Sequence, residues 1–301
     1  MNAYDDARGA LATEGTPKRK KTRWLTLTLR GYVRNRTAVA GAALIIFFTI
    51  VAVLAPWVSP YDPNISDFDH LLEAPTWEHP MGTDDLGRDI LSRAIHGGRV
   101  SLQVAVLAIG IASVVGVTAG VMAGYFGRWV DTVIMRMADT LMAMPGLVLV
   151  IVLVGVLGPS LRNAMLAIAI LYIAPFARIV RANTLSIREL EYVQAARAVG
   201  ASDIRIMFTA VLPNTLSPII VMISLAAGIA ILIEAGLSFL GLGIQPPQPS
   251  WGGMLAQGRQ FIEQSWWMTT FPGLIIFVTV LSLNFIGDGL RESLDPKQRR
   301  R

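Results

Sequence analysis

The run QAARAVGASDIRIMFTAVLP, from Gln194 to Pro213, separates two long apolar stretches and sets the plan of the chain. Residues 178–214 around it carry five arginines, so this segment should stay in water at the membrane surface. Its first half has helical composition and small side chains, and Gly200 is the expected left-handed stop. Ser202 can cap a second helix, which Pro213 is expected to end. The pattern predicts a helix-turn-helix hairpin that projects into the cytoplasm.

The rest of the chain is apolar enough to cross a membrane. It has 301 residues, of which 53% are hydrophobic and only 16% charged. Runs of about 18 apolar residues cover roughly 30 Å of hydrocarbon, and we count six such runs. They lie at 37–59, 101–124, 137–158, 163–181, 215–240 and 271–289. The expected fold is an all-α membrane protein with one six-span domain over residues 37–289.

Charge sets the expected orientation, because short loops rich in Lys and Arg stay in the cytoplasm. With both termini inside, all but five of the 26 Lys and Arg residues lie on the cytoplasmic side. The predicted segments are a cytoplasmic tail at 1–36 with a surface helix, an outside loop at 60–100, a cytoplasmic loop at 182–214, an outside loop at 241–270 and a cytoplasmic tail at 290–301. The basic residues lie beside the spans, where they meet anionic lipid, so we expect no nucleic-acid partner.

The first outside loop is expected to contain a helix of its own, over residues 83–96. Gly97 and Gly98 would stop it, and Asp89 and Arg93 would form an i,i+4 ion pair on one of its faces. Such an amphipathic segment should lie flat on the outer leaflet. In the other outside loop, Trp251, Trp266 and Trp267 are expected as headgroup anchors.

No metal, cofactor or catalytic site is predicted. Asp84, Asp85 and Asp89 lack the alternating spacing of a calcium loop, and capping and solvation explain them better. The three histidines of the same loop, His70, His79 and His96, do not have metal-ligand spacing. The chain has no cysteine, no phosphate-binding GxxxxGK[ST] loop and no nucleophile beside a base. We therefore expect a protein that is not an enzyme and draws no energy from ATP by itself.

Three glycines at four-residue intervals in the second span, Gly116, Gly120 and Gly124, leave one helix face bare. Another backbone can approach such a face closely, so it should be buried against protein. Three prolines within or near the ends of spans can kink them: Pro145, Pro175 and Pro218.

The hairpin resembles the EAA loop of ABC importer permeases. The matching positions are Gln194, Ala195, Ala196, Gly200, Leu212 and Pro213. Gln194 replaces the usual leading acid, and Ala210 stands where an Ile is usual. The first departure removes one ion pair with an ATPase, but the glycine and the Leu-Pro end remain.

Three longer segments are similar to the C-type permease subunit of dipeptide and oligopeptide importers. They are HPMGTDDLGRDILSRAIHGGRVSL at 79–102, EAGLSFLGLGIQPP at 234–247 and LNFIGDGLRESLDP at 283–296. The resemblance implies a type I importer fold in a prokaryotic inner membrane. It also implies a second permease, two ATPases that bind the cytoplasmic loops, and an extracytoplasmic substrate-binding protein.

Glu234 is the clearest acid inside a span, and such a residue is a candidate functional site. The apolar residues around it can carry one acid through the membrane, so a structural or gating ion pair is favoured over binding of a peptide's amino group. Import of nickel or a metal chelate is the alternative within the family. A proton-driven secondary transporter using Glu234 is the alternative from another class, although it would need more buried acids.

Overall fold

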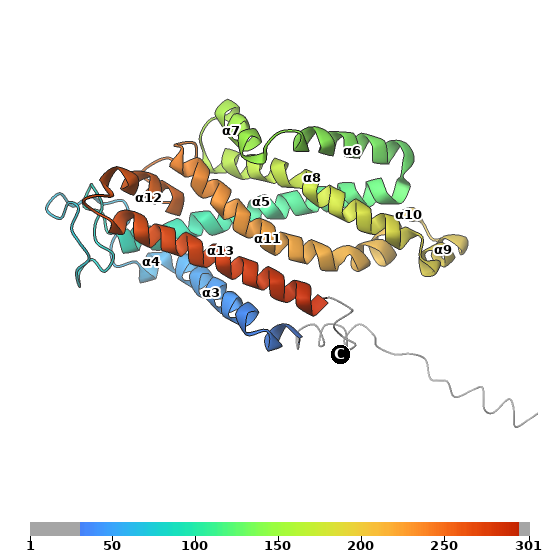
Figure 1. Cartoon of the computed structure of the whole chain (residues 1–301), viewed down its shortest axis with the longest axis horizontal. Coiled ribbons are helices and arrows are strands. Elements are labelled where there is room, and N and C mark those ends of the chain that lie inside the picture. The colour runs from blue at the N-terminus through green and yellow to red at the C-terminus, as the bar shows by residue number, and fades with distance from the viewer. Residues whose placement is uncertain (1–30, 295–301) are drawn as a thin grey trace, which may run out of the picture.

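The computed structural model describes residues 31–294, and its regular elements in that range are helices (Figure 1). In chain order they are α3 (Arg36–Val53), α4 (Ala55–Val58), α5 (Ile90–Phe126), α6 (Arg128–Met142), α7 (Gly146–Leu157), α8 (Leu161–Arg188), α9 (Glu191–Ala198), α10 (Asp203–Ile206), the π-helical turn η1 (Met207–Val211), α11 (Leu212–Phe239), α12 (Trp251–Gly258), the 3₁₀ turn η2 (Arg259–Phe261) and α13 (Trp267–Leu294). The all-α prediction is confirmed. The predicted tail before residue 31, most of its surface helix, and the end of the C-terminal tail lie outside the described residues.

Five helices in the described range are long and apolar enough to cross a membrane: α3, α5, α8, the run Asp203–Phe239 and α13. The third predicted span, 137–158, is not one straight helix. It is divided between α6 and α7, which meet at an angle of 88°. Pro145 caps α7 with an extended ψ of 128°, and its lack of an N–H prevents the helix from continuing. Counted as one span, the bent pair would bring the total to six.

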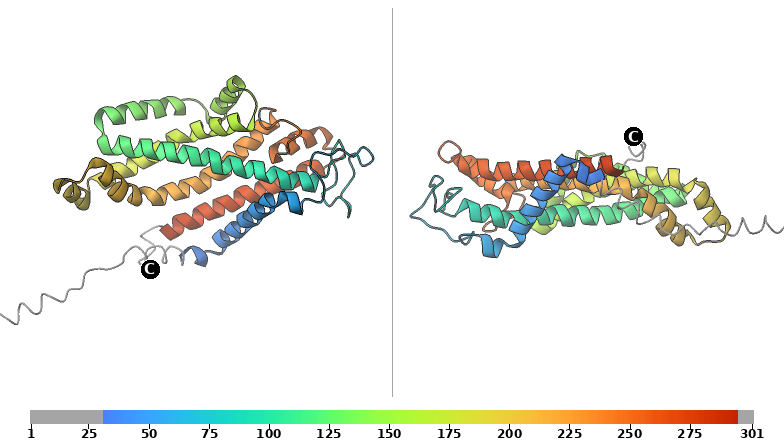
Figure 2. Two further views of the ribbon diagram at one scale, coloured as in Figure 1. Left: turned by 180° about the vertical axis from the view of Figure 1, so that it is seen from behind. Right: turned by 90° about the horizontal axis from the view of Figure 1, so that it is seen from below.

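The centre of the bundle is the packing of α5 against α8, and the left view of Figure 2 shows the two helices side by side. Gly116, Gly120 and Gly124 all face α8. A Cβ atom on Gly120 would lie 2.5 Å from the carbonyl oxygen of Ala177, and one on Gly116 would lie 2.6 Å from that of Ile173. The three glycines therefore form the close helix contact that their spacing predicts.

The predicted flat helix at 83–96 is wrong. Asp89 caps α5 by accepting a hydrogen bond from the Ser92 amide at 2.7 Å, and the helix then runs on to Phe126 without a stop. Gly97 and Gly98 lie inside α5 because they pack against the indole of Trp251: added Cβ atoms would come within 3.2 and 3.1 Å of its ring. They provide space for Trp251 and do not end a helix.

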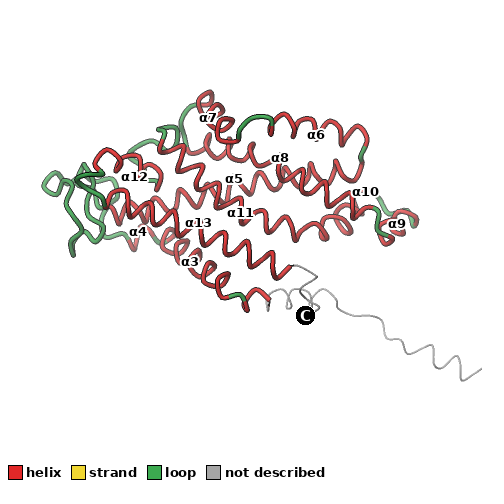
Figure 3. Tube along the Cα trace, viewed as in Figure 1, coloured by secondary structure: helices red, strands yellow, loops and turns green. Residues whose placement is uncertain are grey.

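The second helix of the hairpin also continues further than predicted. α10, η1 and α11 form one continuous helical run, so Pro213 does not end it and instead lies in the first turn of α11. The amide of Leu212 bonds to the carbonyl of Met207, which makes a wider π turn just before the proline. This turn relieves the clash between a proline ring and the carbonyl four residues earlier. Loops gather at the two ends of the bundle, mainly over residues 59–89 at one end (Figure 3).

Candidate functional site

The hairpin projects from one end of the bundle as α9, a sharp turn and α10 (Figure 1). Gly200 has a φ of +81°, the left-handed conformation predicted for it. The turn closes with hydrogen bonds from Gly200 to the Arg197 carbonyl at 3.0 Å and from Ala201 to the Ala196 carbonyl at 3.1 Å. This pattern is a glycine-dependent helix C-terminus. Ser202 then caps α10, as predicted, by accepting from the Arg205 amide.

The residues that match the EAA pattern fall into two groups. Gln194, Ala195, Ala196 and Gly200 lie together on α9 and its turn, where all but the half-buried Ala196 are exposed. Leu212 and Pro213 lie apart from them, at the start of α11. Asn214, the residue after Pro213, connects the start of α11 to α9, because its side-chain amide nitrogen donates to the hydroxyl of Tyr192 on α9 at 3.0 Å.

Exposed apolar side chains surround the turn, and sequence reasoning missed them. Val199 is 84% exposed, Ile204 66% and Phe208 64%. Ile206, two residues after Ile204, is buried. Apolar side chains clustered on a projecting hairpin are typical of a surface that another protein covers.

A polar network connects the hairpin to the end of α5. The hydroxyl of Tyr125 donates to the Asp203 carboxylate at 2.7 Å, and the Arg197 guanidinium lies 5.3 Å from the centre of the Tyr125 ring. Arg188 donates to the carbonyl of Gly124 at 2.8 Å. These contacts border a polar cavity of about 770 Å³ beneath α9. A force on α9 can therefore reach α5 and α8 through direct contacts.

Glu234 lies at the opposite end of the bundle and is 1% exposed. Its carboxylate oxygens accept hydrogen bonds from the Ser238 hydroxyl at 2.8 Å and the Ser101 hydroxyl at 3.1 Å. Within residues 31–294 no cation forms a salt bridge with it, so the predicted ion pair is not made by this part of the chain. Hydroxyl donors on α5 and α11 satisfy the carboxyl group instead.

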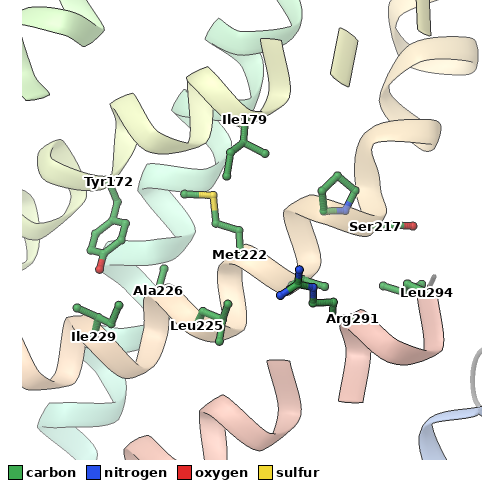
Figure 4. Close-up of a pocket in the computed structure, with 11 residues that line it drawn as sticks. Tyr172, Ile179, Ser217, Met222, Leu225, Ala226, Ile229, Arg291 and Leu294 are labelled. Atoms are coloured by element: carbon green, nitrogen blue, oxygen red, sulfur yellow. The ribbon is translucent and has the colours of Figure 1, made fainter. Parts of the chain in front are cut away.

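A groove of about 630 Å³ runs between α8, α11 and α13 (Figure 4). Its walls are mainly apolar, but Tyr172, Ser217 and Arg291 contribute polar groups. Polar side chains inside a membrane seldom face lipid and are more often directed to protein or to an aqueous path.

The loop at residues 59–89 has a defined structure that uses its charged residues internally. His79 pairs with Asp89 at 3.0 Å. Arg93 pairs with Asp84 at 3.4 Å, so the predicted pair with Asp89 is wrong. No group of three potential ligands for a metal occurs among the described residues.

Two of the predicted headgroup anchors are buried instead. The indole N–H of Trp251 donates to the carbonyl of Ala94 at 2.8 Å, and that of Trp267 donates to the carbonyl of Thr83 at 3.1 Å. Trp266 is 54% exposed. The two buried indoles therefore fasten α12 and α13 to the start of α5 and to the loop before it.

Sequence comparisons place these features in a known context. Residues 116–300 match the family of binding-protein-dependent transport system inner membrane components, and residues 22–75 match the N-terminal TM domain of oligopeptide transport permease C. A dipeptide transport system permease protein DppC of Alkalihalophilus pseudofirmus is 46% identical, with 88% of each chain covered. A di/tripeptide permease DppC of Pseudomonas aeruginosa is 41% identical over 99% of this chain and 98% of that one. A glutathione permease GsiD of Pectobacterium atrosepticum is 43% identical, with 89% of each covered.

Two solved structures share the fold. An amino acid ABC transporter chain aligns with a TM-score of 0.53 at 18% identity, covering 68% of this chain and 95% of that one. A chain of the MetNI methionine ABC transporter aligns at 0.52 and 15% identity, covering 67% and 97%. On the family match and the close relatives, this chain belongs to the binding-protein-dependent inner-membrane components, as a multi-pass ABC importer permease of the oligopeptide permease C type.

Proposed function

We propose that this permease carries short peptides inward, as one of two permeases in a complex with two ATPases and an extracytoplasmic binding protein. The names of its relatives support peptides over nickel, since they transport dipeptides, tripeptides or glutathione. ATP hydrolysis belongs to the partners, because the sequence lacks a phosphate-binding loop.

The main observation that supports this mechanism is the shape of the hairpin. α9 presents Gln194 and Ala195 on an exposed, narrow helix face, and the apolar side chains of Val199 and Ile204 flank its tip. Such a helix can enter a groove of an ATPase, where the short alanine side chain allows close contact. When the ATPase pair closes on ATP, the hairpin moves with it, and the Tyr125 and Arg188 contacts pass that movement to α5 and α8.

The groove between α8, α11 and α13 is proposed as this chain's share of the transport path. Apolar walls with a few hydroxyl groups suit peptides with varied side chains, since such walls do not select for one particular peptide side chain. Tyr172 and Ser217 would contact the peptide there, and Arg291 lies at one end of the groove. The second permease would close the open side.

The experiment that tests this function is uptake by the whole transporter in proteoliposomes containing ATP. Labelled dipeptide, tripeptide, glutathione and nickel are supplied with the binding protein in separate assays. Uptake of peptide that requires ATP supports the proposal. Uptake of nickel alone would select the alternative cargo, and uptake driven by a proton gradient without ATP would indicate a secondary transporter.

A further inference from the structure

At the end of the bundle opposite α9, a cavity of about 350 Å³ opens between α12, the chain after α11 and the loop before α5. Figure 1 shows these three segments together at that end of the bundle. Its walls are rich in hydrogen-bond donors. They include the side chains of Arg88, Arg93, Ser238, Gln245, Gln248 and Ser250.

The two guanidinium groups are buried and share one acid. Arg88 and Arg93 are each 5% exposed. Their Nε atoms lie 2.8 and 3.4 Å from the same oxygen of Asp84. Arg93 also donates to the carbonyl of Pro63 at 2.9 Å. Among the described residues Asp84 is the carboxylate in direct contact with both guanidiniums, and Asp85 acts on Arg93 through its charge at longer range.

Most N–H donors of the two guanidiniums have no acceptor within residues 31–294. Each of the two residues keeps a small accessible surface, 5% of its total. Since both side chains line the cavity, that surface is available to a small ligand inside it.

The two neighbouring acids accept their side-chain hydrogen bonds from other groups. The side-chain amide of Gln257 donates to Asp85. Glu234 does not line the cavity, and Ser238, which does, donates its hydroxyl to that carboxylate. A negative group that enters the cavity would therefore meet guanidinium and carboxamide groups, since the Ser238 and Ser250 hydroxyls already donate to other acceptors.

We propose that this cavity binds the terminal carboxylate of a short peptide during its passage, with Arg88 and Arg93 as the recognition residues. The inference rests on the proposed function. A planar guanidinium matches a carboxylate by two parallel hydrogen bonds. The volume is at the small end of ligand sites, which run from about 300 to 1,000 Å³, so a dipeptide suits it. The glutamine carboxamides at the rim can pair with the peptide backbone.

The test uses the absence of cysteine in this chain. Gln248→Cys places one thiol at the exposed rim, and its rate of maleimide labelling is measured in the assembled transporter. Dialanine in tenfold excess over its Kd should slow labelling about tenfold, because little of the site stays free. Dialanine amide, which lacks the carboxylate, should give no protection. Gln264→Cys, exposed and outside the cavity, should label at an unchanged rate.

Arg88→Gln in the Gln248→Cys background should abolish the protection. Arg88→Lys keeps the charge beside Asp84 but loses the two parallel N–H donors, so it should give weaker protection, and co-purification of the partner subunits checks that the complex still assembles. Equal protection by the amide, or protection that survives Arg88→Gln, would overturn the proposal. Protection by the binding protein without peptide would also overturn it, by assigning the cavity to protein docking. If wild-type transporter imports dialanine while the thiol remains unprotected, this site fails and the peptide function stands.

Discussion

Gly200 offers a sharp test of the hairpin, because its substitution acts on backbone conformation alone. Its φ of +81° lies where side chains with a Cβ are strained, and an added Cβ would meet no atom within 4 Å. The cost of an L residue in this conformation is about 1–2 kcal/mol, and it is greatest for β-branched side chains. Asn tolerates the left-handed region and serves as the matched control.

We therefore expect Gly200→Val to lower the ratio of hairpins with the native turn to hairpins without it by roughly 5- to 30-fold. Peptide uptake by proteoliposomes should fall by about tenfold per ATP hydrolysed, while the amount of this chain in the membrane stays unchanged, since Gly200 lies outside the packed bundle. Gly200→Asn should retain most of the uptake. Unchanged uptake for the valine variant would refute the role of the turn. Equal loss for asparagine would show that exposed side-chain volume matters, not backbone conformation.

Three further predictions concern the bundle and its far end. Gly120→Leu should lower thermal stability in detergent by an overpacking cost of about 1–3 kcal/mol, whereas Gly110→Leu on the same helix, with nothing within 4 Å of its Cβ, should not. Glu234→Gln should be far milder than Glu234→Ala in uptake and thermal stability if serine hydroxyls are its main partners, and equal severity would require a charged role. The hydrogen bond and charge of Asp67 raise the pKa of His70, and the same contact lowers the pKa of Asp67. His70 stabilises the folded loop fully when the pH is below the pKa that His70 has in the unfolded chain, and this stabilisation is lost as the pH rises through its raised pKa in the folded state. The stabilisation from Asp67 is lost as the pH falls through the lowered pKa of Asp67 in the folded state. Amide hydrogen exchange of residues 67–70, corrected for its intrinsic rate, should therefore be slowest at pH values between the pKa of Asp67 and the pKa of His70. His70→Asn should remove the change in exchange at the higher of these two pKa values.

Much of this structure could be predicted because its signals are local. Long apolar runs indicate helices through the hydrocarbon, and the spacing of Gly116, Gly120 and Gly124 indicates one helix face. The left-handed turn at Gly200 and the cap at Ser202 depend on neighbouring residues alone. These elements follow from short-range stereochemistry.

Some of the wrong predictions involve residues whose partners are distant in the chain. Gly97 and Gly98 are typical of a helix stop, yet they accommodate the indole of Trp251, more than a hundred positions away. Trp251 in turn is buried because a carbonyl on α5 accepts its N–H. Pro213 is typical of a helix end, but the π turn before it lets the helix continue. The partners of the two glycines and of Trp251 lie outside any local pattern, whereas the π turn is a local departure from the usual effect of a proline.

The candidate site was predictable in part. The positions of α9 and its turn came from one segment, whereas the exposure of Val199 and Phe208 depends on how the hairpin leans on the bundle. The cavity at Arg88 and Arg93 combines the loop before α5 with the chain around α12. Its donors only come together once the helices are packed.

The most direct test of the account is disulfide cross-linking of α9 to an ATPase in the active transporter. Ala195→Cys in this cysteine-free chain is paired with cysteines along the ATPase groove, and Trp129→Cys, 81% exposed on α6, is the control. If α9 is seated in the ATPase, residue 195 should form a cross-link that stops peptide uptake and is reversed by a reductant, and residue 129 should form none. An active transporter in which residue 195 forms no cross-link, or cross-links no better than residue 129, would contradict it.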